Sequence, residues 1–428
     1  MKHRIFWTDQ KIASRLPLIA PLIHRRRAPI TPCRYRVLDG PLAPAPVGPD
    51  VDTADWQEIP FDSYWGGWST DFVMRTEFTV PTDFSGPIAL HLPLGVAGDI
   101  FCHPEGLAYI DGESFASADR QHHEIYLDDN WCDGQAHSLA LHGWTGLSGW
   151  PPDRHSKLKL HMKECAVAEI DVPTRDFYNL TRLALDVAQH MDEGNTARNK
   201  ILKALDRAFT TLDTRDPMRS DAFYDSVPAA LETLHAEMQD YAGRMEVDMI
   251  AVGHAHIDVA YLWQVAQTRR KTGRTFSNVL RLMDEHPDYH FSQSQPVLYE
   301  MAEEDYPEVF DGIQARVADG HWEAMGGMWV EPDCNLAGGE ALVRQIMLGR
   351  GYFRDKFGDK ETPVLWLPDT FGFTASLPQL MVQSGLKWFV ANKLNWNQYN
   401  QMPNQLFWWE GIDGSRVLSH LLTTPSTV

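Results

Sequence analysis

Three side chains that can bind a metal ion stand at alternate positions in one short stretch of the chain. His254, His256 and Asp258 follow Gly253 in the sequence GHAHIDVAYLW. Alternate residues of an extended chain point the same way, so these side chains can converge on one point. Imidazole and carboxylate are ligands that suit zinc in a site open to substrate. On this stretch alone, histidines that only form hydrogen bonds in a loop are an equally good interpretation.

A further carboxylate comes at the end of another expected strand. Val364–Leu367 is a short apolar run, which Pro368 and Asp369 end in the sequence PVLWLPDTFGF. The simplest role for an aspartate in this place is to cap a helix or stabilise a turn. However, the carboxyl ends of parallel strands also carry the active sites of α/β enzymes and barrels. Together the two stretches favour a metal site made of His256, Asp258 and Asp369.

Strands and helices alternate in the part of the chain that carries these residues. Met249–Val252 is an apolar run without charge, which predicts a buried parallel strand that ends directly before Gly253. From there, short apolar strands alternate with amphipathic helices as far as Phe389–Asn392. A βαβα series predicts a parallel sheet covered by helices, and the pattern alone does not choose between a doubly wound sheet and a barrel.

The preceding residues show other patterns. Residues 1–50 are rich in proline and predict a lead-in with one helix. Short alternating stretches such as Phe72–Val80, separated by Gly, Asp and Pro turns, predict an antiparallel β-sandwich over residues 51–168. Apolar side chains at helical spacing predict a helical connector over residues 169–245. Trp65 and Trp68 of the sandwich are candidates for stacking on sugars, although buried core positions are the simpler interpretation.

Four motifs of the α/β part resemble a known enzyme family. GHAHIDVAYLW, GGMWVEPDCNL, LPDTFGF, and NKLNWNQ followed by FWWEGIDGSRVLSH, occur in this order. They are similar to the zinc-dependent α-mannosidases of glycoside hydrolase family 38, in the branch with cytosolic, vacuolar and many bacterial enzymes. The resemblance extends from about Val247 to the end of the chain and more loosely before it. It implies a jelly-roll-like sandwich and then a (β/α)7 barrel catalytic domain over residues 246–428.

The resemblance also implies a ligand set. In the family, one zinc ion is held by residues that match His256, Asp258 and Asp369, and by a second histidine far downstream. We expect that histidine and the general acid beyond Val428, so that the barrel would be incomplete, truncated at the C-terminus. Asp369 matches the nucleophile of a retaining mechanism, in which a carboxylate forms a glycosyl-enzyme. His254 would orient a ligand through a hydrogen bond.

Four more residues are implied as substrate contacts. Relatives commonly carry Trp in place of Tyr261, where it forms a platform under the mannose. Tyr261 keeps an aromatic face for stacking, but the substitution could change the substrate preference. Asp333 would contact sugar hydroxyls or support the site. A loop carboxylate that caps the next helix is the alternative for both Asp333 and Glu331. Lys393 and Trp396 directly follow a predicted strand and would contact the substrate.

Composition excludes several other classes of protein. Fifty-eight acidic against 38 basic residues give a formal net charge of −20, which argues against nucleic acid and anionic membrane surfaces as partners. The best apolar run near the amino terminus, Leu16–Ile23, is short and broken by prolines, unlike a signal peptide or a membrane helix. Five scattered cysteines without a C-x-x-C motif indicate neither a disulfide framework nor a thiolate zinc site. We therefore expect a cytoplasmic protein, and homo-oligomerisation is left open.

Three functional hypotheses follow. The first is a zinc-dependent retaining α-mannosidase that acts on mannose-containing glycans, with one metal ion that cobalt or calcium could replace. The second is a metal-dependent carbohydrate deacetylase, which also uses His and Asp at barrel strand ends. That class needs His-x-x-x-His spacing, which is not found near Asp258 or Asp369. The third is a non-catalytic carbohydrate-binding protein built on the sandwich, and intact His256, Asp258 and Asp369 argue against it.

Overall fold

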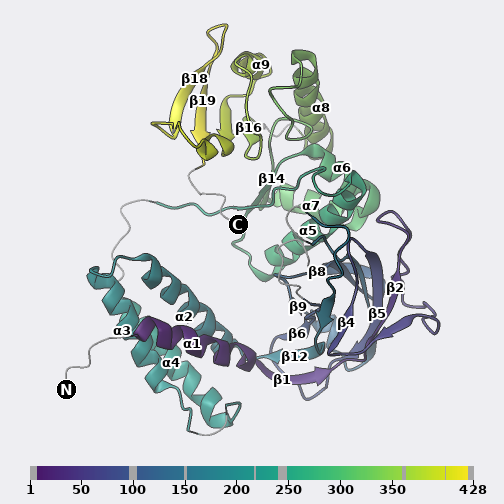
Figure 1. Ribbon diagram of the computed structural model, residues 1–428, viewed down its shortest axis with the longest axis vertical. Coiled ribbons are helices and arrows are strands. Elements are labelled where there is room, and N and C mark those ends of the chain that lie inside the picture. The colour runs from purple at the N-terminus through teal and green to yellow at the C-terminus, as the bar shows by residue number, and fades with distance from the viewer. Residues whose placement is uncertain are drawn as a thin grey trace.

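The computed structural model describes residues 7–95, 104–148, 152–215, 218–239, 248–358, 363–400 and 402–422 of the chain. Figure 1 shows a helical cluster, a group of antiparallel sheets, and an α/β part that extends away from both. Tyr241 and Val247, which the sequence assigns to a helix and a strand, lie outside these residues. No helix in the described ranges combines the length and the apolar character needed to cross a membrane.

Two antiparallel sheets form between residues 24 and 170. Their strand orders are β1-β12-β6-β9 and β3-β2-β5-β10-β7-β8, and a separate ladder pairs β4 with β11. The two sheets share one core, to which Leu90 and Val167 contribute from the first sheet and Phe72 and Leu141 from the second. The predicted strand at Phe72–Val80 is confirmed as β5. The strands are β1 His24–Pro29, β2 Cys33–Val37, β3 Gln57–Ile59, β4 Ser63–Trp65, β5 Asp71–Thr79, β6 Ile88–His91, β7 Glu105–Ile110, β8 Glu113–Ala118, β9 Glu124–Tyr126, β10 Ala136–Trp144, β11 Leu160–Met162 and β12 Ala166–Ile170.

The proline-rich lead-in contributes two of these strands, which the sequence pattern did not predict. β1 has the sequence HRRRAP, in which no apolar alternation marks a strand. Its stability comes from the partner strand, because Arg26 lies opposite Glu169 of β12 and forms an ion pair with it. Trp65 is buried in the core, and its indole N–H donates to the carbonyl of Leu94, so the core interpretation is confirmed for this residue.

The helical cluster consists of α1 Thr8–Ile19, α2 Val172–His190, α3 Thr196–Thr211 and α4 Asp221–Gln239, around a core of their own. Helix α2 begins where the Asp171 carboxylate accepts a hydrogen bond from the backbone N–H of Thr174. Phe177 of α2 and Phe209 of α3, two of the apolar side chains at helical spacing in the predicted connector, have rings packed 5.3 Å apart. Val187 of α2, which the same spacing predicts to share the buried face with Phe177, is instead exposed.

The α/β part contains two sets of parallel strands. β13 Gly253–His254, β14 Phe291–Gln293 and β15 Trp322–Ala324 form one set, and β16 Val364–Leu367, β17 Trp388–Ala391 and β19 Arg416–Leu421 form the other. A parallel bridge between Gly326 and Leu365 connects them, and β18 Leu406–Glu410 adds an antiparallel edge. Over the described residues the strands do not close into a barrel. The helices are α5 Val265–Glu285, α6 Pro296–Asp305, α7 Pro307–Asp319, α8 Gly339–Phe357 and α9 Leu377–Gln383.

The buried strand predicted at Met249–Val252 was wrong. The strand begins only at Gly253 and comprises two residues, whereas Ile250 is 95% exposed and Val252 is 51% exposed. β13 is the outer strand of its sheet and pairs only with β14 among the described residues. The apolar run therefore lacks a neighbour on its open side, which removes the burial that an apolar strand requires.

Helix α5 connects the antiparallel sheets to the predicted metal-binding stretch. Lys271 and Arg274 both form ion pairs with Glu105 at the start of β7. Near the start of α5, the hydroxyl of Thr268 donates to the carbonyl of Val259 in the loop after β13, 2.7 Å away. The sheets therefore hold the helix, and the helix holds the loop that follows the first parallel strand.

Candidate metal and active site

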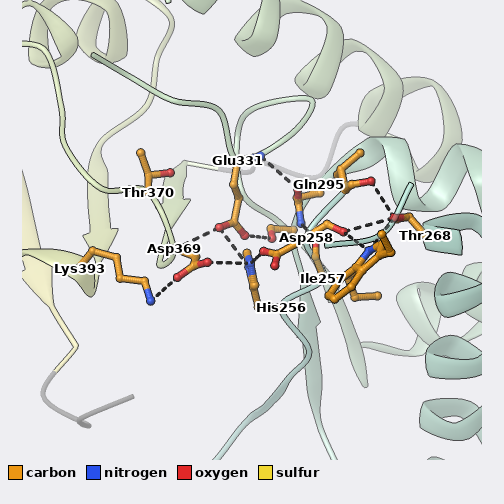
Figure 2. Close-up of polar contacts among 12 residues, drawn as sticks. His256, Ile257, Asp258, Thr268, Gln295, Glu331, Asp369, Thr370 and Lys393 are labelled. Atoms are coloured by element: carbon orange, nitrogen blue, oxygen red, sulfur yellow. Dashed lines mark hydrogen bonds and ion pairs between the residues drawn. The ribbon is translucent and has the colours of Figure 1, made fainter. Parts of the chain in front are cut away.

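His256, Asp258 and Asp369 lie together at the ends of two parallel strands. His256 and Asp258 follow β13, and Asp369 follows β16 (Figure 2). His256 Nε2 lies 2.7 Å from Asp258 Oδ1 and 3.4 Å from Asp369 Oδ2. One ligand atom from each residue falls within 4.8 Å of the others. One imidazole and two carboxylates at this separation are a donor set that fits a divalent ion such as zinc.

A further carboxylate, that of Glu331, faces the same histidine from the loop after β15 (Figure 2). Glu331 Oε2 lies 3.3 Å from His256 Nδ1 and accepts a hydrogen bond of 3.4 Å from the backbone N–H of Asp369. The hydroxyl of Ser294 donates to Oε1 at 2.9 Å. The side chain is only 4% exposed, so its charge depends on these partners.

The carboxylates around His256 favour a cation at this point. Burial alone would lower the pKa of His256, but hydrogen bonds to Asp258 and Glu331, together with their charges, raise it to about 10. A divalent ion would supply the positive charge that the protonated ring otherwise supplies. Nε2 would then bind the ion while Nδ1–H donates to Glu331, the usual arrangement for a metal-binding histidine.

Gln295 connects the two segments that carry His256 and Glu331 through hydrogen bonds. Its side-chain amide donates to the carbonyl of Ile257 at 2.8 Å, and its amide oxygen accepts from the backbone N–H of Glu331 at 3.1 Å. The residue has a φ of 64°, in the left-handed region that residues other than glycine rarely adopt. Strained backbone of this kind persists where the surroundings hold it, commonly at functional sites.

Lys393 contacts Asp369 from the other side. Its ammonium group forms an ion pair with Asp369 Oδ1 and lies 3.5 Å from the ring centroid of Trp396. The ring of Phe371 is 4.9 Å from the same nitrogen, and both aromatic rings are largely exposed. Lys393 therefore holds one oxygen of the carboxylate and leaves the other facing His256.

The remaining predicted site residues have other surroundings. His254 Nδ1 donates to the carbonyl of Ser292 at 2.8 Å, and its Nε2 accepts from the indole N–H of Trp366 at 3.2 Å. Burial lowers the pKa of His254, which fits a neutral ring with both nitrogens in use. Tyr261 is 54% exposed, and its ring packs edge-on against Trp263.

The carboxylate of Asp333 is exposed and forms hydrogen bonds within its own loop. Its Oδ1 accepts hydrogen bonds of 2.8 Å from the backbone N–H groups of both Asn335 and Leu336. These hydrogen bonds lower the pKa of Asp333. The geometry is that of a carboxylate stabilising a turn. Asp333 does not cap the next helix, because the N-cap of α8 is Gly338.

Sequence reasoning did not assign Glu331 or Gln295 to the site. One signal was present, because the apolar pattern also predicts a strand over residues 322–329, and Glu331 follows it just as Asp369 follows its own strand. Gln295 gave no such signal, because its contacts join residues 36 to 38 positions apart in the chain.

Comparison with known proteins shows which enzyme family the part of the chain with this site resembles. Residues 246–427 match the profile of the "Glycosyl hydrolases family 38 N-terminal domain". Over these residues the chain is similar to glycoside hydrolase family 38. Human "Alpha-mannosidase 2C1" is 33% identical over 374 residues, which cover 84% of this chain and 34% of the human protein. "Alpha-mannosidase G" of Dictyostelium discoideum is 45% identical over 170 residues, which cover 40% of this chain and 16% of that protein.

The chain spans about a third or less of the length of these curated relatives. Among solved structures, an alpha-mannosidase from Enterococcus faecalis V583 aligns with 40% of this chain and 19% of its own, with 21% sequence identity and a TM-score of 0.36. His256, Asp258, Glu331 and Asp369 all lie within the residues that match the family profile.

Proposed function

We propose that this chain carries the metal-binding site of a zinc-dependent retaining α-mannosidase, which hydrolyses terminal α-mannosyl residues of mannose-containing glycans. The observation that carries the proposal is the convergence of His256, Asp258 and Asp369 at two strand ends. The names of several relatives support the substrate class, because the human, Dictyostelium discoideum and Saccharomyces cerevisiae proteins that match this chain are described as alpha-mannosidases.

Asp369 is the proposed nucleophile. Its carboxylate would attack the anomeric carbon and form a glycosyl-enzyme as the bond to the leaving oxygen breaks. A second carboxyl group at ~5 Å donates a proton to that oxygen and then activates the water that releases the sugar. The ion pair with Lys393 supports this role, because it fixes one of the two carboxylate oxygens of Asp369.

His256, Asp258 and Asp369 are the residues that would hold the ion. Bound there, zinc would contact adjacent hydroxyls of the mannose ring and hold the ring in shape for reaction. Glu331 would orient the His256 ring through Nδ1, and its contact with the Asp369 backbone would keep the nucleophile in place. Trp396 and Tyr261 are proposed as aromatic contacts for the sugar, since both rings are about half exposed.

The same proposal extends to the architecture. We propose a lead-in at residues 1–50, which adds β1 and β2 to the sheets of a jelly-roll-like sandwich at 51–168. A helical connector at 169–245 and a (β/α)7 barrel domain over 246–428 follow. The parallel strands on either side of the Gly326–Leu365 bridge support the barrel, and the shared core of the two antiparallel sheets supports the sandwich. A cytoplasmic location is proposed from the scarcity of cysteine.

The test is hydrolysis of an aryl α-mannoside by protein that includes the second histidine and the general acid expected beyond Val428. It is measured with zinc present, after EDTA treatment, and after zinc is added back. We expect EDTA to abolish turnover, zinc to restore it, and Asp369→Ala to remove it. Asp311→Asn, which changes an exposed aspartate of α7, is the matched control and should retain full activity. Turnover that survives Asp369→Ala would contradict the nucleophile assignment and with it the proposed mechanism.

A further inference from the structure

A cavity of about 700 Å³ lies beside His256 and Asp258, between the antiparallel sheets and helix α5. Ligand pockets in proteins commonly measure roughly 300–1,000 Å³, so this space is large enough for a small organic ligand. One wall is formed by β7, β8 and residues 119–122 of the following loop, and the facing wall by Lys271, Arg274 and Asn278 of α5. The cavity thus joins the sheets to the proposed metal site.

Specific contacts fix the two walls relative to each other. The hydroxyl of Ser117 donates to the carbonyl of Arg274 at 2.8 Å. The Asn278 side-chain nitrogen lies 3.1 Å from His122 Nε2, which places the 119–122 loop directly on the helix. These contacts join a strand and a loop of the sheets to helix α5. They therefore fix the shape of the cavity between them.

Several charged groups around the cavity form pairs with one another. Lys271 and Arg274 both pair with Glu105, with nitrogen–oxygen distances of 2.6 Å. Asp119 accepts hydrogen bonds from the His122 ring and from the backbone N–H of Gln121. A phosphate or carboxylate ligand would have to compete with these internal pairs, so the walls favour a neutral ligand.

Aromatic and hydrogen-bonding groups occur together in the same cavity. Trp263 and Tyr289 supply ring surface, and Arg120, Gln121 and Thr275 supply groups that can bond to hydroxyls. Aromatic faces combined with a few polar groups suit saccharides, which present both apolar C–H faces and hydroxyls.

We propose that this cavity is a subsite for a neutral saccharide unit of the substrate, distinct from the mannose that is cleaved. The loop at residues 119–122, which belongs to the antiparallel sheets, would then contribute to the choice of glycan. The inference rests on the proposed α-mannosidase function. It also assigns the sheets a part in substrate binding that does not involve Trp65, which is buried in their core.

The test compares α-mannotriose with an aryl α-mannoside as substrates. Two variants probe the cavity: Arg120→Ala with Gln121→Ala removes polar groups, and Thr275→Phe fills space. We expect the ratio of kcat/KM for mannotriose to kcat/KM for the aryl mannoside to fall by about 3- to 10-fold in both, the effect of one or two lost hydrogen bonds. Arg182→Ala, on the exposed face of α2, is the matched control and should leave the ratio unchanged.

The outcomes separate this inference from the proposed function. If the unsubstituted protein hydrolyses the aryl mannoside but both cavity variants keep the original ratio, the subsite is overturned and the proposed function stands. If the unsubstituted protein hydrolyses neither substrate in the presence of zinc, the proposed function fails, and the subsite proposal falls with it. Hydrolysis of the aryl mannoside by each variant also reports that the variant has folded.

Discussion

Glu331 Oε2 lies 3.3 Å from His256 Nδ1, and the same oxygen accepts a hydrogen bond from the backbone N–H of Asp369. One buried carboxylate therefore contacts both segments that carry the proposed ligands. Its other oxygen is held by Ser294, and its own backbone N–H is held by Gln295. This arrangement makes the orientation of His256 depend on a residue that would not itself bind the ion.

Replacing Glu331 with Gln should weaken metal binding. The variant keeps the size of the side chain but removes the negative charge that orients the imidazole, and changes of this kind typically cost about 10- to 100-fold in metal affinity. Zinc affinity would be measured by competition with a chromophoric chelator, and the visible spectrum of the cobalt form would report the ligand geometry. Glu340→Gln, at an exposed position of α8, is the control. Equal zinc affinities for the two variants would show that Glu331 has no such role.

Lys393→Met should lower kcat for an aryl α-mannoside. Without the ammonium group, Asp369 loses the partner that fixes Oδ1, and a misplaced catalytic group can cost about 100-fold in rate. Lys159→Met, which changes an exposed lysine far from Asp369 in the sequence, is the control. The assignment of Lys393 as a positioning residue would be refuted by a kcat within twofold of the unsubstituted protein.

The central geometry of the site could be predicted because it depends on local pattern. Asp369 follows the apolar strand β16, and His256 and Asp258 follow the short strand β13. The ends of such parallel strands meet at one edge of the sheet. Glu331 could not be assigned in the same way, since its loop offered two acidic residues with no local feature to distinguish them. The structure separates them by burial: Glu331 points into the site, whereas Asp333 binds the backbone of its own turn.

The errors in the fold also have a physical cause. Ile250 and Val252 have the composition of a buried strand, but burial depends on a neighbouring strand that the composition of the segment does not reveal. Arg26 is the opposite case, because its segment does not have the composition of a strand but forms one. It does so by pairing with β12, in which Glu169 lies opposite Arg26 and forms an ion pair with it. Both cases are decided by contacts between distant segments.

His142 should make stability depend on pH. Burial, followed by the charges of Arg270 and Arg274, lowers the pKa of His142 to about 3. Between pH 6.5 and 3 the unfolded chain binds a proton that the folded chain excludes, so this contribution to stability is lost as pH falls, by up to ~1.4 kcal/mol per pH unit. Urea unfolding at pH 7 and pH 4.5 should show a loss roughly 2 kcal/mol larger for the unsubstituted protein than for His142→Gln. Parallel losses in the two proteins would contradict the prediction.

Two helical glycines should respond oppositely to alanine. A Cβ at Gly273 of α5 would collide with the ring of buried Tyr306, and overpacking of this kind costs about 1–3 kcal/mol. A Cβ at Gly351 of α8 would meet no heavy atom within 4 Å, so Gly351→Ala should stabilise by about 0.5–1 kcal/mol through helix propensity. The free energies of urea unfolding of both variants provide the measurement. Stabilisation by Gly273→Ala would refute the packing of α5 on Tyr306.

The most direct test of the site is the zinc content of the protein after equilibrium dialysis against a buffered zinc solution. Unsubstituted protein and Asp258→Ala would be compared, with Asp311→Asn as a control for the loss of one negative charge. We expect one zinc ion per chain in the unsubstituted protein and in the control. In Asp258→Ala the affinity should be weaker by at least about 100-fold, since one of the protein ligands is lost. Equal zinc content and affinity in all three proteins would show that His256, Asp258 and Asp369 do not form the metal site.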